Sequence, residues 1–181
     1  DPSLNSLEYL SKSKGWSMPQ TLQITSQVVE MAKSEGSEFN MEQTVVANTK
    51  NAHRLIHFAE AAGKGADMKE RLLNAYFTQG ENVDDFETLQ KLGTEVGLDA
   101  GEIKAMLGSD KFHEEVEKDI YESRLIGVQG VPFFVLDRKF GISGAQADQV
   151  FDQTLEKAWA DFIKENPELQ FVQGSDENTC E

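Results

Sequence analysis

Apolar residues recur at helical spacing along most of the chain, and glycines follow several of the apolar segments. This pattern predicts a short helix that ends near Gly15 and a longer helix that begins at Met18 and ends at Gly36. A third helix is expected to start at the cap candidates Asn48–Thr49 and to end at Gly63. The apolar face expected on the second helix is formed by Leu22, Val28, Val29 and Ala32. The apolar sets that predict the following four helices are Met68, Leu72, Leu73, Tyr76 and Phe77; Phe86, Leu89, Leu92 and Val96; Ile103, Met106 and Leu107; and Phe112, Val116 and Ile120.

The periodicity changes after Gly127. The run VPFFVLD is apolar at both parities, which predicts a strand with both faces covered. The run RKFGISG predicts a second strand, joined to the first by a tight turn around Asp137–Lys139. Two strands alone are only marginally stable in water, and Phe133–Leu136 would form an apolar edge. We therefore expect the sheet to include strands from residues upstream of Asp1 or from a second copy of the chain.

A last amphipathic helix follows the two strands, and Pro167 blocks its extension. The residues expected on its wide apolar face are Val150, Phe151, Leu155, Ala158, Trp159 and Phe162.

Length and composition describe one folded domain, or one domain with an insertion, in 181 residues and 20.2 kDa. The net charge of −15 argues against nucleic acid and anionic membranes as partners, because phosphates are bound by basic patches. No apolar run approaches the roughly 20 residues of a membrane span, and no signal peptide is apparent. The chain opens with Asp1–Pro2 instead of methionine, which suggests that upstream residues were removed.

A single cysteine, Cys180, excludes disulfides within the chain and suits a cytoplasmic location. His53 and His57 are four residues apart, a spacing found at metal sites, but no third ligand is evident. A packed or surface pair is favoured, and no metal site is predicted. His113 is expected on a solvated helix face.

The stretch GVQGVPFFV at 127–135, followed by a hairpin, SGAQ and an amphipathic helix, resembles the C-terminal half of a DsbA-like thioredoxin domain. The closer resemblance is to the FrnE-type branch, which is related to kappa-class glutathione transferase and 2-hydroxychromene-2-carboxylate isomerase. The blocks that carry this closer resemblance are Asn48–Thr49, Ala52–Ala59, Met68–Asp85 and Gly97–Asp99.

The resemblance implies an α/β thioredoxin-like fold with a large helical insertion, mostly α in this chain. Residues 1–17 would follow a missing first half, residues 18–126 would form the insertion, and residues 127–165 would form the second half. Residues 166–181 would be a flexible tail. The first β-α-β unit, which carries the family's Cys-x-x-Cys motif, is absent from these residues. A truncated or proteolysed form is the favoured explanation; the others are a unit supplied by another chain and a natural loss.

The resemblance also implies that Pro132 is a cis-proline at the start of a core strand. The backbone of Val131, next to Gly130, would then pair with an extended peptide or with glutathione. By the same resemblance, Asn48 and Thr49 would edge the substrate groove in addition to capping a helix.

In the glutathione-using relatives, the positions of Ser143, Gly144 and Ala145 hold the γ-glutamyl end of glutathione at a helix N-terminus. Those relatives have Ser-Asp where this chain has Gly-Ala, which counts against glutathione here.

The function implied is thiol–disulfide exchange with a protein or peptide, without a cofactor and with glutathione as the other candidate co-substrate. The chain of 181 residues is expected to be inactive because it lacks Cys-x-x-Cys. The alternatives are a glutathione-dependent isomerase or transferase and a non-catalytic peptide-binding module. A homodimer through the exposed sheet edge is also expected. Cys180 is either a resolving thiol or an incidental exposed cysteine.

Overall fold

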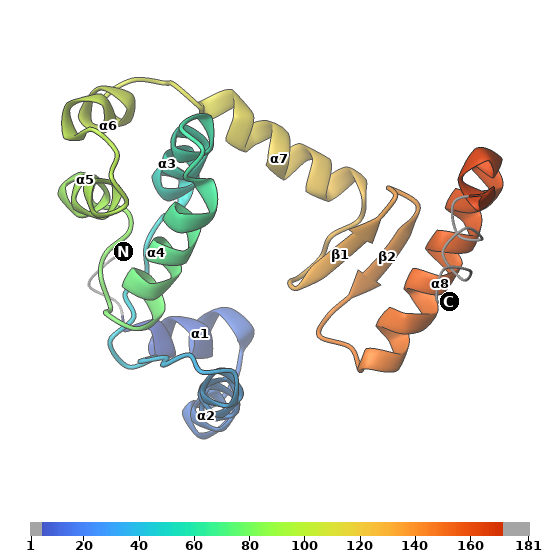
Figure 1. Ribbon diagram of the computed structural model, residues 1–181. Coiled ribbons are helices and arrows are strands. Elements are labelled where there is room, and N and C mark those ends of the chain that lie inside the picture. The colour runs from blue at the N-terminus through green and yellow to red at the C-terminus, as the bar shows by residue number, and fades with distance from the viewer. Residues whose placement is uncertain (1–4, 172–181) are drawn as a thin grey trace, which may run out of the picture. The chain divides into compact units, whose positions relative to one another are not determined.

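The computed structural model describes residues 5–171, which fold into two compact units that meet at Asp119–Ile120 (Figure 1). The first unit contains α1 (Ser6–Lys14), α2 (Met18–Ser34), α3 (Lys50–Ala61), α4 (Gly65–Phe77), α5 (Phe86–Glu95) and α6 (Ala100–Leu107). Helix α7 (His113–Leu125) spans the boundary. The second unit contains β1 (Phe133–Leu136), β2 (Phe140–Ser143), α8 (Asp148–Glu165) and the 3-10 helix η1 (Pro167–Phe171).

The boundary between the units differs from the division at 126–127 expected from the sequence. The sequence shows where helical periodicity gives way to strand periodicity, whereas the contacts change inside the continuous helix α7. Residues 167–171, near the start of the segment expected to be a flexible tail, form η1. Cys180 lies outside the described residues.

The core of the first unit is built from the apolar stripes of α3, α4, α5 and α6. Its largest fully buried apolar side chains are Leu55, Met68, Leu89, Leu92 and Ile103. The helical spacing therefore identified these elements correctly. The stripes of α4 and α5 are narrower than expected, however, since Leu73 and Phe86 are exposed.

Capping side chains fix where several of these helices begin. Ser17 and Gln20 form a capping box at the start of α2, and Asp99 Oδ1 accepts the Glu102 N–H at 2.9 Å at the start of α6. Gly15 lies beyond α1 with a φ of 68°, a left-handed conformation that suits glycine.

Helix α2 does not bury the face expected from its sequence. Leu22 and Val28 are 43% and 41% exposed, whereas Thr21 and Thr25 are buried. The Thr25 hydroxyl donates to the Thr21 carbonyl at 2.9 Å, and the Thr21 hydroxyl donates to the Ser17 carbonyl at 3.1 Å. Because both hydroxyls are bonded to carbonyls of their own helix, these threonines can be buried like small apolar side chains. A count of apolar residues cannot detect such buried positions.

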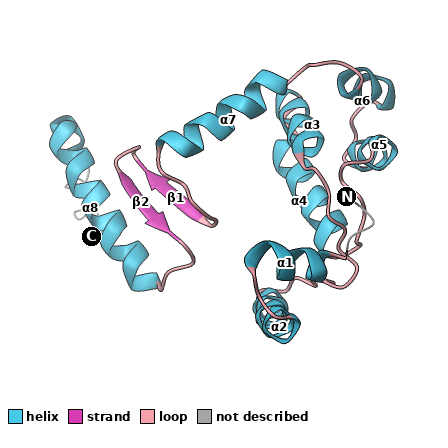
Figure 2. Cartoon of the chain, turned by 180° about the vertical axis from the view of Figure 1, so that it is seen from behind, coloured by secondary structure: helices cyan, strands magenta, loops and turns pink. Residues whose placement is uncertain are grey.

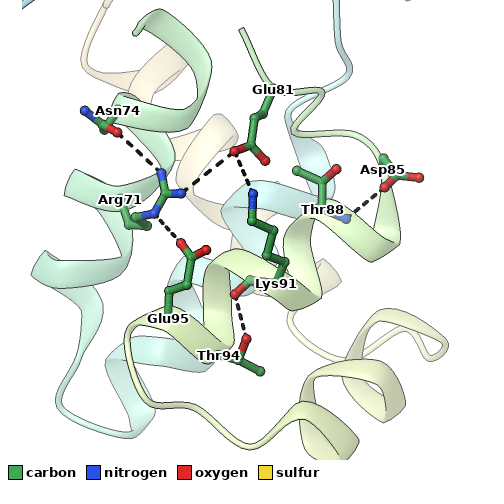
Figure 3. A network of polar contacts seen from close by, with 8 residues as sticks. All are labelled: Arg71, Asn74, Glu81, Asp85, Thr88, Lys91, Thr94 and Glu95. Atoms are coloured by element: carbon green, nitrogen blue, oxygen red, sulfur yellow. Dashed lines mark hydrogen bonds and ion pairs between the residues drawn. The ribbon is translucent and has the colours of Figure 1, made fainter. Parts of the chain in front are cut away.

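A network of charged side chains ties α4 to α5 and to the segment between them (Figure 3). Arg71 on α4 donates through Nε to Glu95 at 2.6 Å, and its Nη2 lies 3.9 Å from Glu81. Lys91 on α5 binds the same Glu81 carboxylate at 3.0 Å. These pairs are partly exposed, so each one contributes little to stability.

The second unit contains a β-hairpin beside a helix, and the figures show α8 alongside β2 (Figure 2). Strands β1 and β2 pair antiparallel, with Phe133 opposite Ser143 and Leu136 opposite Phe140. Asp137 and Arg138 both have positive φ values, 49° and 54°, as a type I′ turn requires. The turn was expected at this place.

The expected coverage of both faces of β1 is not met by the described residues. Phe134 and Val135 are each 41% exposed, although the Phe134 ring meets Phe151 of α8 edge to face at 5.0 Å. On α8, Ala158 is buried while Trp159 is half exposed. The apolar surface of this unit therefore exceeds what the described residues cover.

Within residues 5–171, no helix combines the length and apolar character that a membrane crossing requires.

Candidate functional site

The segment before β1 presents unpaired backbone to its surroundings. The Val131–Pro132 peptide bond is cis, and the Val131 residue is 89% exposed. The N–H and C=O groups of Gly130 and Val131 form no hydrogen bond with any described residue. The Pro132 carbonyl, by contrast, accepts the Gly144 N–H at 2.8 Å. The backbone is therefore unpaired at Gly130 and Val131, and pairing with the other arm of the hairpin begins at the Pro132 carbonyl.

The register of the hairpin extends this free backbone along β1. Pro132 and Gly144 stand opposite each other and share a hydrogen bond, so alternate pairs along the ladder do the same. Phe133 and Val135 occupy the pairs between them, and their N–H and C=O groups point away from β2. Val131, Phe133 and Val135 thus form one open edge, which we call the β1 edge.

The structure brings Ser143, Gly144 and Ala145 next to this segment. Ser143 lies opposite Phe133, and Gly144 bonds to Pro132 with a φ of 85°, a conformation that favours glycine. Ala145 follows in the turn to α8. These predicted site residues and Pro132 therefore share one end of the hairpin.

The N-terminus of α8 has no side-chain cap. Its N-cap residue, Ala147, has no polar side-chain group, and the first turn carries the acidic Asp148. The carboxylate of Asp148 already complements the helix dipole and would repel a second carboxylate placed there.

Asn48 and Thr49 belong to the first unit, so their part in a common site remains a prediction. Asn48 Oδ1 accepts the Lys50 N–H at 3.0 Å, which is the capping role expected of it. Thr49 occupies the N-cap position of α3, but its side chain makes no capping bond. Both residues are exposed.

Two of the three histidines contact charged side chains. His57 Nε2 lies 2.9 Å from Asp119, its Nδ1 lies 3.3 Å from Glu60, and its ring stacks on Phe112. His57 is thus packed, as one of the two alternatives favoured from the sequence, and His53 is exposed. His113 lies 3.3 Å from Lys50 Nζ and is only partly exposed.

A cluster that sequence reasoning missed joins the hairpin turn to α8. The carboxylates of Asp137, Asp161 and Glu165 surround Lys139 Nζ at 3.2, 3.1 and 2.6 Å. Hydrogen bonds to Glu165 and then to Asp161 raise the pKa of Lys139. Three carboxylates this close together could bind a metal ion, but here the Lys139 ammonium already serves as their cation. The signal available in the sequence was the i,i+4 spacing of Asp161 and Glu165.

Comparisons with known proteins show which family the chain resembles. Residues 4–156 match the profile of the DSBA-like thioredoxin domain. The structure resembles the probable DsbA oxidoreductase SCO1869 from Streptomyces coelicolor with a TM-score of 0.81 and 33% identity, covering 88% of this chain and 72% of that one. The chain is also 30% identical over 103 residues to the uncharacterized protein YwbO of Bacillus subtilis, covering 55% of this chain and half the length of that relative. The chain therefore belongs to the DSBA-like thioredoxin domain family.

Proposed function

We propose that this chain carries the substrate-binding part of a thiol–disulfide oxidoreductase whose substrates are disulfide-containing polypeptides. The observation that supports this proposal is the free backbone of Val131 at the end of the β1 edge. An extended peptide adds to such an edge through its own main-chain groups, independent of its side chains. This kind of binding suits an enzyme that acts on many disulfides.

The chemistry proposed is exchange through a mixed disulfide. A thiolate attacks one sulfur of the substrate disulfide, so that one S–S bond forms as another breaks and the leaving sulfur departs as a thiolate. Val131 would hold the substrate backbone during this step. The family's Cys-x-x-Cys is not among these 181 residues, and their single cysteine is Cys180. The attacking thiolate would therefore come from polypeptide outside this sequence, and the activity would take place in the cytoplasm.

Glutathione has less support as the substrate. Gly144 and Ala145 offer no side-chain hydrogen-bond donor, and Asp148 would repel the γ-glutamyl carboxylate at the start of α8. A polypeptide substrate needs neither contact, because it binds to the backbone of Val131 at the end of the β1 edge.

Beyond Val131, the rest of the β1 edge leads us to propose that a further strand covers Phe133 and Val135. The outward N–H and C=O groups of this edge and the exposed Phe134 and Val135 need a partner. In thioredoxin folds the first strand pairs with the strand that follows the cis-proline, and the resemblance places that strand outside these residues. In these 181 residues alone, we expect a second copy to take its place.

The experiment that tests substrate binding compares two variants at Val131. Val131→Pro removes the backbone N–H, whereas Val131→Ala keeps it and shortens an exposed side chain. If the N–H bonds to the substrate, Val131→Pro should weaken binding of oxidised insulin about 2- to 12-fold, the equivalent of about 0.5–1.5 kcal/mol. Val131→Ala should leave it nearly unchanged. Equal affinities of both variants, with unaltered circular dichroism, would contradict the proposal.

A further inference from the structure

Helix α2 borders a groove in the first unit, with apolar and polar lining, that the proposed function does not use. This groove of about 320 Å³ lies between α2 and the loop Phe39–Gln43. Its apolar lining includes Leu7, Leu22, Val29, Phe39 and Met41. We call it the α2 groove. Its volume is within the range of about 300–1,000 Å³ that is common for ligand pockets.

The dimensions of the α2 groove suit two apolar side chains of a polypeptide. Leu22 and Val29 are seven residues apart on one face of α2, which corresponds to about 10 Å along the helix axis. Two side chains four residues apart on a bound helix span about 6 Å and would both enter a groove of this length.

The charge of the α2 groove indicates which kind of partner it can bind. Glu30 and Glu42 line it, and no lysine or arginine does so among the described residues that form its wall. Nucleic acid and anionic lipid are unsuitable for such a surface. The same groove of a second copy is also an unsuitable partner, because its wall carries the same two glutamates. A polypeptide segment with apolar side chains and a neighbouring lysine or arginine complements both features.

We propose that the α2 groove binds such basic and apolar segments of the polypeptides whose disulfides are exchanged. The identity of these polypeptides as substrates rests on the proposed function. Unfolded polypeptides expose the apolar segments that folded proteins bury. The groove would recognise those side chains, whereas the end of the β1 edge would recognise only main-chain groups. The two sites would therefore bind different parts of one substrate.

The test uses a short fluorescein-labelled peptide without cysteine that has two leucines at i and i+4 and lysines beside them. Fluorescence anisotropy gives its Kd for the chain. Leu22→Gln and Glu30→Lys should each weaken binding about 5- to 10-fold, since each removes one complementary contact. A second peptide, with glutamates in place of the lysines, should bind more weakly to the unaltered chain and regain affinity for Glu30→Lys.

The matched control is Met31→Gln. Met31 is 62% exposed on the same helix but does not line the groove, so its substitution should leave Kd unchanged. Equal weakening by Met31→Gln and Leu22→Gln, or no weakening by Leu22→Gln and Glu30→Lys, would overturn the proposal. Circular dichroism checks that all three variants fold.

Other occupants give different results. Peptide binding only by a variant that begins at Asn5 would show that the chain's own first residues occupy the groove. Loss of self-association in Leu22→Gln would show that a second copy does so. Either result would overturn the proposal. Because the peptide has no cysteine, it measures groove binding apart from disulfide exchange, and failure of the Val131 experiment alone would reject the proposed function without affecting this result.

Discussion

Replacing Arg54 should destabilise the first unit more than replacing any surface arginine. Arg54 lies on α3 and is only 6% exposed, yet it pairs with no carboxylate among the residues that the structure describes. Its guanidinium donates to the carbonyls of Met106 at 2.8 Å and Lys111 at 2.9 Å, to the Ser109 carbonyl, and to Asn51 Oδ1. It thereby binds the end of α6 and the loop after it.

The expected magnitude follows from the acceptors that Arg54→Leu would leave behind. The Met106 carbonyl would keep the Ser109 hydroxyl at 2.9 Å, whereas the carbonyls of Ser109 and Lys111 would lose the only hydrogen bonds that they form with described residues. An unsatisfied buried acceptor costs about 1–3 kcal/mol, and these two are partly buried, which favours the lower half of that range. We expect a loss of about 2–4 kcal/mol. Lysine, with one ammonium group, cannot reach all three carbonyls, so Arg54→Lys should restore only part of this loss.

The assay follows urea unfolding of the first unit by tryptophan fluorescence. Trp16 lies in the first unit and Trp159 in the second, so a Trp159→Phe background leaves Trp16 as the reporter. Arg71→Leu is the matched control, because Arg71 binds partly exposed carboxylates and should cost about 1 kcal/mol or less. Equal losses for Arg54→Leu and Arg71→Leu, or a loss below about 0.5 kcal/mol for Arg54→Leu, would refute this reasoning.

Three further predictions concern the second unit and the cysteine. The raised pKa of Lys139 means that its stabilising effect is complete below the ordinary lysine pKa of about 10.4 and is lost as pH rises from there through the raised pKa. The difference in Tm between the unaltered chain and Lys139→Met, read from Trp159, should therefore shrink above a pH of about 10.4. A constant difference would contradict this prediction. Val135→Lys should place a charge on the β1 edge and convert the dimer expected of these 181 residues into monomer in sedimentation experiments, whereas a monomeric unaltered chain would show that the edge does not self-associate. The chain should not speed insulin reduction by dithiothreitol; turnover that disappears in Cys180→Ser would instead make Cys180 the attacking thiol.

Local sequence signals predicted much of the first unit. The glycine at position 15, the cap at Asp99 and the stripes through Leu89 and Ile103 each depend on neighbours within a few residues. Signals of this kind can be read from the residues of one segment alone. They could not reveal the role of Arg54, because three of its four partners lie more than 50 residues further along the chain.

In the candidate site, too, a contact fixed by a local turn could be predicted, whereas contacts with a more distant segment could not. The proximity of Pro132 to Ser143 could be predicted, because a tight turn between two strands fixes which residues face each other. The cluster around Lys139 was missed, since its members come from the turn and from the last two turns of α8. The burial of α2 was also misjudged, because its buried positions carry threonine.

The backbone amide of Val131 gives the most direct test of the central claim, which is that the end of the β1 edge binds substrate main chain. In the ¹⁵N-labelled chain, oxidised insulin should shift the amide resonance of Val131 and slow its exchange with solvent, because a free N–H becomes hydrogen-bonded. The amide of Ile142, in the buried part of β2, should change little. An unchanged Val131 resonance at insulin concentrations that saturate binding would contradict the account.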